Sequence, residues 1–350
     1  METAVKKKYF DELNVFRALI IVWVVIGHSF SPDESVTGFL YYYAYSFHMS
    51  AFFMLSGLLF FPKLSRIGSV KDAVVTVWDR FKRLMVPYFV YTVITYVLKL
   101  IFSEYAYNEL SSNIIVDTLI CRNNPNGGIW FLYALFVLSM IAVLVCRIPV
   151  WISFIISAAL KALSVAVLIN IPIVGFICQY SFYFFAGLLL FQYYAAISEK
   201  LNRFVSGKKG KSIVLILCMV LLAASFAVVG LLHNRKIYDY LTVPVTLLGI
   251  FTWYIVSFAV CSFKFAKKPA MIIGNYGMDI YVIGYFVQIS IRVILGTMLG
   301  LPYPLYATMM FLFGLFLPIP ISKYIIRKVG ILRAVFLGEF PKKKKSVEKI

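Results

Sequence analysis

The sequence predicts an all-α integral membrane protein, a polytopic helical bundle with about ten transmembrane helices and both termini in the cytoplasm. Hydrophobic residues make up 62% of the 350 residues and charged residues only 14%, whereas a soluble domain is about half apolar and a quarter charged. Proline, glycine and charge clusters divide the chain into apolar segments, each near the roughly 20 residues that cross a bilayer as a helix. Basic residues gather at alternate ends of these segments, which sets the orientation.

Local signals bound the predicted spans in order along the chain. The first span follows Lys6–Lys8, the second ends at Pro62, the third begins after the basic stretch that reaches Arg83, and the fourth follows Gly127-Gly128. Later spans are separated by further basic clusters and by Pro- or Gly-containing turns. The predicted spans are about 10–30, 45–61, 84–103, 128–146, 150–168, 173–197, 212–232, 241–261, 270–296 and 305–326.

The distribution of Lys and Arg places one side of this bundle in the cytoplasm. Loops on the opposite side carry only Arg122, Arg235 and Lys236, so the positive-inside rule puts both termini at the basic side. The basic clusters are Lys6–Lys8, the stretch from Lys63 to Arg83, Arg147, the stretch from Lys200 to Lys211, Lys264 with Lys267 and Lys268, and the tail from Lys323 through Lys345.

Charge and cysteine content exclude other classes of protein. The net charge is +19, but it is divided among the loops instead of forming one basic face, so nucleic acid is not an expected partner. The five cysteines stand singly, so we expect no metal site. We therefore interpret residues 1–350 as one transmembrane domain, in which residues 341–350 form a basic cytoplasmic tail.

The first span contains two ionisable side chains, Arg17 and His28, inside an otherwise apolar run. Such groups are costly in a membrane and usually mark function. They are eleven residues apart, so they share one helix face at a separation of about 16 Å along the axis. The alternatives are that Arg17 extends its guanidinium to the interface and that His28 is an interior histidine with a structural hydrogen bond.

The second span places His48 at a depth similar to that of His28, so these two histidines are candidates to face each other. Its segment Phe47–Gly57 reads FHMSAFFMLSG. His48 could equally lie at the membrane interface beside the aromatic residues Tyr41–Tyr45. The small pair Ser56-Gly57 also suits close helix packing.

Several motifs in order resemble acyltransferase family three, particularly its fucose-O-acetylase-like and exopolysaccharide O-acetyltransferase members. They are Arg17 with His28, the FHM segment at Phe47, RFKRLMVPY at Arg80, WFL at Trp130 and GNYGMDIYVIG at Gly274. The resemblance covers essentially the whole chain. The chain departs from the family pattern at Asn14, where many members have Asp, and at Gly277 and Gly284, where Ser and His are common.

The resemblance implies transfer of an acyl group, usually acetyl from cytoplasmic acetyl-CoA, to a hydroxyl of a cell-surface polysaccharide or a lipid-linked sugar. His28 is then the catalytic residue, either as general base or as a nucleophile that relays the acyl group. Arg17 would assist it by contacting the donor or neutralising the thiolate leaving group. No metal is implied.

Further residues suit the two substrates of this reaction. Arg80, Lys82 and Arg83 could bind the phosphates of CoA, or serve only as positive-inside charges. His48 and Trp130 are candidates to contact the sugar, Trp130 by stacking, although an interfacial Trp also anchors helices.

The sequence also leaves open a different class of protein, a polysaccharide or glycolipid transporter or flippase without transferase activity. Transporters often show inverted repeats and broken helices in matching halves, and this chain has no recognisable repeat. For either class we expect a multi-pass protein of the bacterial cytoplasmic membrane. Its partners would be the bilayer and a carbohydrate, and it would be either a monomer or a homo-oligomer.

Overall fold

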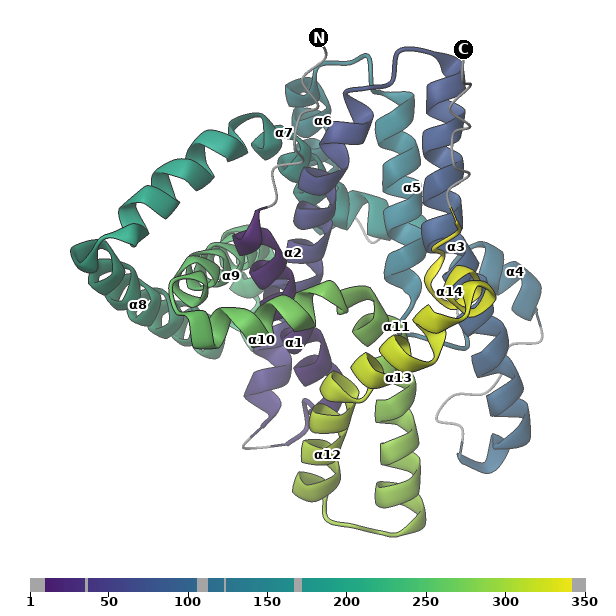
Figure 1. The fold of residues 1–350 in the computed structure, drawn as a ribbon. Coiled ribbons are helices and arrows are strands. Elements are labelled where there is room, and N and C mark those ends of the chain that lie inside the picture. Colours follow the sequence, from purple (N-terminus) through teal and green to yellow (C-terminus); the bar gives the residue numbers. More distant parts are fainter. Residues whose placement is uncertain (1–9, 35–36, 106–112, 123, 167–171, 342–350) are drawn as a thin grey trace.

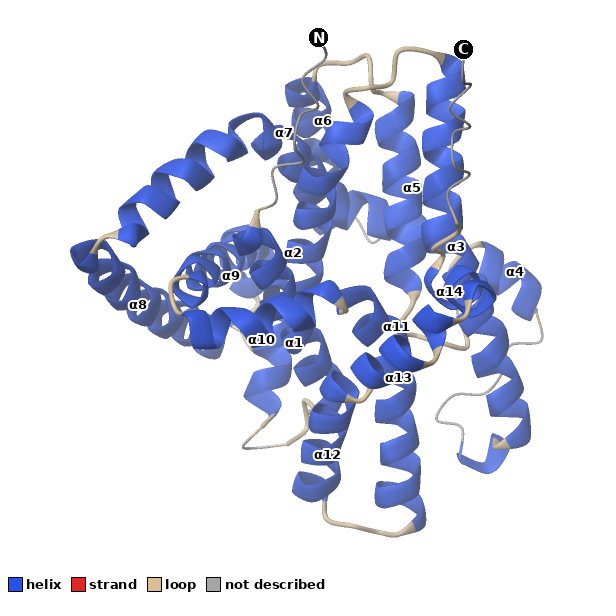
Figure 2. Cartoon of the chain, in the orientation of Figure 1, coloured by secondary structure: helices blue, strands red, loops and turns tan. Residues whose placement is uncertain are grey.

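The computed structural model describes residues 10–34, 37–105, 113–122, 124–166 and 172–341. Every regular element in these ranges is a helix (Figures 1 and 2). The predicted basic tail lies almost entirely outside the described residues. The helices are α1 (Asp11–Ser29), α2 (Gly38–Leu64), α3 (Val70–Ile101), α4 (Ile114–Leu119), α5 (Trp130–Leu144), α6 (Val150–Ala166), α7 (Pro172–Ser206), α8 (Lys208–Leu232), α9 (Ile237–Cys261), α10 (Lys264–Asn275), α11 (Gly277–Ile291), α12 (Tyr303–Phe316), α13 (Pro318–Tyr324) and α14 (Gly330–Leu337).

The helices confirm the predicted class of an all-α membrane bundle. Within the described residues, eight helical segments are long and apolar enough to cross a membrane, and two shorter apolar helices, Trp130–Leu144 and Val150–Ser164, accompany them. The ninth predicted span, about 270–296, is corrected at its start, because residues 264–275 form the separate helix α10. The transmembrane helix α11 begins at Gly277 and continues into the π-helix Arg292–Met298.

Helix α1 is the centre of the bundle. In the most apolar 18-residue stretch of α1, 72% of the residues are buried by the rest of the protein. The corresponding share is 22% in α8, at the left edge of Figure 1. Helix α1 packs against α2, α9, α10, α11 and α12. Helix α10 crosses the beginning of α1, where Lys267 Nζ lies 2.5 Å from Asp11 Oδ2. The helix that carries Arg17 and His28 is therefore held on several sides.

Helices α2 and α7 form the most extensive helix pair. A Cβ atom on Gly57 would collide with the carbonyl of Phe184, and one on Gly187 would collide with the carbonyl of Met54. Small residues allow membrane helices to approach at the level of their backbones. Gly57 thus has the packing role that its small size suggested.

Helix α3 begins well before the predicted start near residue 84. Ser69 Oγ accepts from the backbone N–H of Asp72 at 3.2 Å, and Asp72 Oδ2 accepts from the backbone N–H of Ser69 at 3.0 Å. This reciprocal capping box starts the helix at Val70. Residues 70–83, which the sequence predicted to lie in a basic loop, form the first turns of α3. Arg80, Lys82 and Arg83 therefore lie on a helix.

Candidate active site

His28 occupies the last turn of α1 and is half-buried. Its ring lies edge-on to Tyr285, at 5.3 Å between centroids, and to Tyr45, at 6.2 Å. Among the residues that the structure describes, none hydrogen-bonds to the His28 imidazole. Its nitrogens are thus available to a reacting group.

His48 is buried in α2 and approaches the same tyrosine. Its ring centroid is 5.0 Å from that of Tyr45, and its Nδ1 atom lies 2.5 Å from the carbonyl oxygen of Ala44. Because a carbonyl oxygen can only accept, Nδ1 carries the proton, and Nε2 is the acceptor nitrogen when the ring is neutral. The structure therefore brings His28 and His48 near one aromatic ring, that of Tyr45, as their similar depth suggested.

A small cavity of about 10 Å³ lies beside His28, between α1, α11 and the loop before α5. That volume is about the space of one water molecule. Its walls are mostly apolar or aromatic. They consist of Val24, Val25, His28, Gly128, Ile280, Tyr281, Tyr285 and Gln288.

Gln288 fixes the turn of α1 that carries His28. Its Nε2 donates to the carbonyl oxygen of Val25 at 2.9 Å and to Ser29 Oγ at 2.8 Å, and the side chain is only 2% exposed. The sequence reasoning missed this residue. The available signal was a lone amide within an apolar span, where polar groups are normally paired.

Arg17 lies on the same face of α1 as His28, near the start of the helix. Its side chain contacts the amide of Asn14, at the position where many family members have the carboxylate of Asp. Arg17 Nη1 donates to Asn14 Oδ1 at 3.4 Å, and Asn14 Nδ2 donates to the Met271 carbonyl at 3.1 Å and to Asn275 Oδ1 at 3.0 Å. A Cβ on Gly277 would lie 3.2 Å from Arg17 Cδ. The departures from the family pattern at Asn14 and Gly277 therefore both lie against Arg17.

The departure at Gly284 has a packing explanation. A Cβ on Gly284 would approach the carbonyl oxygen of Gly314 at 2.6 Å, which is too close for any side chain without movement of α12. A histidine at this position is incompatible with the observed α11–α12 contact.

A large cavity of about 1020 Å³ opens beside Arg17. It is lined by Arg17, Ser56, Leu59, Lys63, Asp79, Arg80, Lys82, Arg83, Gly338, Glu339, Phe340 and Pro341. Five of these side chains are cationic and two are carboxylates, so its charged lining has three more positive charges than negative ones. The four cations predicted to contact the donor thus share one cavity that suits a large polyanion.

The three predicted donor-binding residues of α3 are not equivalent. The Arg80 guanidinium lies over the Phe60 ring at 4.1 Å, and its buried Nε has no hydrogen-bond partner among the described residues. In contrast, Lys82 Nζ is 2.9 Å from Asp79 Oδ1, and Arg83 Nη1 donates to Glu339 Oε1 at 2.8 Å. Arg80 is therefore the cation of α3 that most needs an anion.

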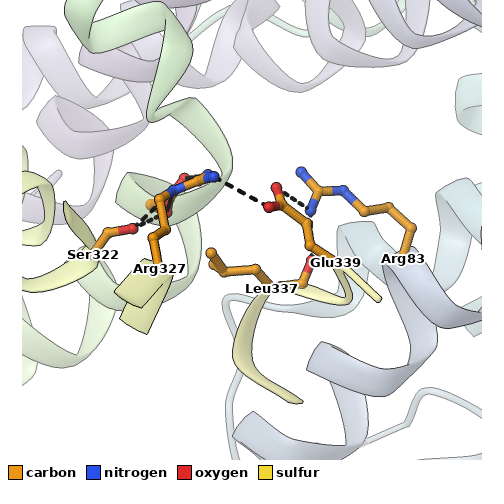
Figure 3. A network of polar contacts seen from close by, with 6 residues as sticks. Arg83, Ser322, Arg327, Leu337 and Glu339 are labelled. Carbon is orange, nitrogen blue, oxygen red and sulfur yellow. Dashed lines mark hydrogen bonds and ion pairs between the residues drawn. The ribbon is translucent and has the colours of Figure 1, made fainter. Parts of the chain in front are cut away.

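Arg83 belongs to a polar network that holds the C-terminal segment (Figure 3), whose residues 338–341 line part of the cavity. Figure 3 shows Glu339 between Arg83 and Arg327, and Arg327 Nη1 donates to Glu339 Oε2 at 3.1 Å. Arg327 Nη2 donates to Asp279 Oδ2 at 2.9 Å, and Asp279 also accepts a hydrogen bond from Ser322. The network links the late motif of α11 to α3, a connection that sequence reasoning did not find.

Trp130 begins α5 inside an aromatic cluster. Its ring stacks on Phe176 at 4.5 Å with an interplanar angle of 22°, and Tyr180 and Phe53 lie at 5.4 and 6.3 Å. Trp130 lines neither of the two cavities described above. Because Phe176 covers one face of the ring, a contact with sugar stays a prediction, and only the opposite face could make it.

Comparison with known proteins adds one finding. A family model described as an acyltransferase domain, acyltransferase family three, matches residues 10–323. Neither the curated proteins nor the solved structures include a match to the chain. The matched range includes every residue that lines the small cavity and all those that line the large one except residues 338–341 of the C-terminal segment.

Proposed function

The chain belongs to acyltransferase family three, and from this premise we propose that it transfers acetyl from cytoplasmic acetyl-CoA to a hydroxyl of a cell-surface polysaccharide or lipid-linked sugar. The observation that carries the proposal is the arrangement along α1. Arg17 lines the large cation-rich cavity, and His28, on the same helix face, lines the small one about 16 Å further along the axis.

The large cavity is the proposed donor site. CoA carries phosphate groups at one end and a thioester at the end of a long flexible arm. Arg80, Lys82 and Arg83 would hold the phosphates, the two arginines through their planar guanidinium forks and Lys82 as a point charge. Arg17 would receive the arm where it leaves this cavity toward His28, and would stabilise the negative charge that develops on sulfur.

The reaction proposed at His28 is a direct acyl transfer. An imidazole nitrogen of His28 takes the proton of the sugar hydroxyl while the hydroxyl oxygen bonds to the thioester carbonyl carbon. The carbon–sulfur bond then breaks, and the proton passes from His28 to the thiolate. The products are a sugar ester and free CoA, so atoms and charges balance without a metal.

The immobile surroundings of His28 support the role of general base. Tyr45 and Tyr285 lie against the ring, and Gln288 fixes the helix turn beneath it. Holding the base in one geometry removes much of the entropic cost of a proton transfer. His48, whose ring also lies against Tyr45, is the proposed contact for the sugar through its Nε2 atom.

The composition of the surface polysaccharide tests the proposal in cells. Cells that lack the gene should make polysaccharide of normal length whose repeat unit is lighter by one acetyl group, and the wild-type gene should restore the mass. Complete loss of surface polymer with its subunits retained inside the cell would instead identify a transporter and contradict the proposal.

A further inference from the structure

The small cavity beside His28 has a shape that bears on which acyl group is transferred. We propose that this cavity receives the methyl end of the acyl group and limits the enzyme to acetyl, with Val24 and Ile280 as the specificity-determining residues. The inference rests on the proposed acyl transfer at His28. It adds a reason, taken from this chain, for a two-carbon acyl group.

The position of Val24 on α1 suits the proposed path of the acyl group. Val24 is four residues before His28 and seven after Arg17, so the three side chains follow one face of α1. Val24 is therefore one helical turn from His28, on the side facing Arg17. Val24 thus lies on α1 between Arg17, which lines the donor cavity, and His28, and it lines the small cavity beside the imidazole.

The cavity volume matches the smallest acyl chain. About 10 Å³ is space for one water-sized group, so among acyl chains the one-carbon methyl end of acetyl needs the least adjustment of the walls. A propionyl or butyryl chain would push its extra carbons into the side chains that line the cavity. The lining has no Asp, Glu, Lys or Arg, which suits an uncharged, apolar end group.

The walls are packed too well to move aside. Val24, Val25 and Ile280 belong to an apolar cluster with Ile21 and Leu315, and each of the five side chains is at most 4% exposed. Side chains in a close-packed core cannot accept an added methylene without strain. The opposite wall is equally confined, because a Cβ on Gly128 would lie 3.2 Å from the Tyr285 ring.

A series of donors tests the proposal directly. Purified protein in liposomes would receive acetyl-, propionyl- and butyryl-CoA with one glycan acceptor, and kcat/KM would be measured for each donor. For the wild type we expect kcat/KM to fall by about 10- to 200-fold with each added methylene. Val24→Ala and Ile280→Ala should each reduce the acetyl-to-propionyl preference at least about tenfold, because each opens the cavity.

A matched control separates the cavity from general core damage. Val282 is fully buried in α11 but does not line the cavity, and Val282→Ala removes the same volume as Val24→Ala. This variant should keep the wild-type donor preference. Thermal unfolding would establish that each variant is folded. If one of the two cavity variants fails to fold, the donor preference of the other still tests the proposal.

Three outcomes would overturn the inference in distinguishable ways. If the wild type has equal kcat/KM for the three donors, the cavity does not select the acyl group by its length, while the proposed transferase activity would stand. An unchanged preference in both folded cavity variants would also reject the assignment of Val24 and Ile280. Absence of transfer from every donor would contradict the proposed function itself, and the pocket with it.

Discussion

The unequal surroundings of Arg80 and Arg83 lead to a quantitative prediction for donor binding. Arg80→Ala removes a guanidinium whose Nε is buried without a partner among the described residues. If Arg80 binds a phosphate of CoA, the variant loses a charge-assisted hydrogen bond of about 1.5–3 kcal/mol. At about 1.4 kcal/mol per tenfold change, the Kd for CoA should rise about 10- to 150-fold.

Arg83→Ala should weaken CoA binding much less. Arg83 Nη1 already donates to the Leu337 carbonyl at 2.6 Å and to Glu339 Oε1 at 2.8 Å. A phosphate would therefore have to compete with an internal carboxylate, and Arg83 is about a third exposed. We expect a rise in Kd of no more than about fivefold, in line with the small net value of partly exposed ion pairs.

The assay is isothermal titration of CoA into detergent-solubilised protein at one fixed ionic strength, because screening changes every charge contact. Arg203→Ala is the matched control, since Arg203 is 80% exposed and pairs with Glu199 far from the cavity. Repeating the titration with CoA that lacks its 3′-phosphate would identify the phosphate that Arg80 contacts. A Kd unchanged in Arg80→Ala, or a larger effect in Arg83→Ala, would refute the reasoning.

Two further predictions concern residues that the sequence did not single out. Gln288→Leu should lower kcat about tenfold with the donor KM unchanged, because it disturbs the placement of His28 and leaves the lining of the large donor cavity intact. A higher KM at constant kcat would reject this role, and Gln179→Leu, at an exposed position, is the control. Asp279→Asn should destabilise the protein by about 2 kcal/mol, below the usual cost of breaking a fully buried pair because Arg327 is 29% exposed. Thermal unfolding measures this as a fall of about 4 °C in Tm, and an unchanged Tm would contradict it.

The sequence predicts the bundle well because membrane spans are a local property. Apolar length, charge clusters and the order of the segments identify the long apolar helices of the described residues without knowledge of their contacts. The errors arose where local signals compete. The basic residues before Arg83 hid the start of α3, although the capping box at Ser69 and Asp72 was readable. The apolar run after Pro269 concealed the break between α10 and α11.

The sequence singles out the cations and histidines of the candidate site, whose roles stay predictions. It does not reveal the residues with which they form hydrogen bonds and ion pairs. Arg17, His28 and His48 are conspicuous because ionisable groups are rare in apolar spans. The partner of Arg83 lies 256 residues away at Glu339, and the amide of Gln288 reaches the Val25 carbonyl from 263 residues away. Pairings at such separations depend on how the helices pack, which no local pattern contains.

The central claim is that His28 carries acyl transfer from CoA to a sugar. The most direct test is transfer of radiolabel from acetyl-CoA to glycan by purified protein in liposomes, comparing the wild type with His28→Ala and with His233→Ala. His233 ends α8, and its Nδ1 lies 3.0 Å from the Val229 carbonyl, so its loss controls for removal of an imidazole. We predict that the wild type and His233→Ala transfer label and that folded His28→Ala does not. Full transfer by His28→Ala would contradict the mechanism.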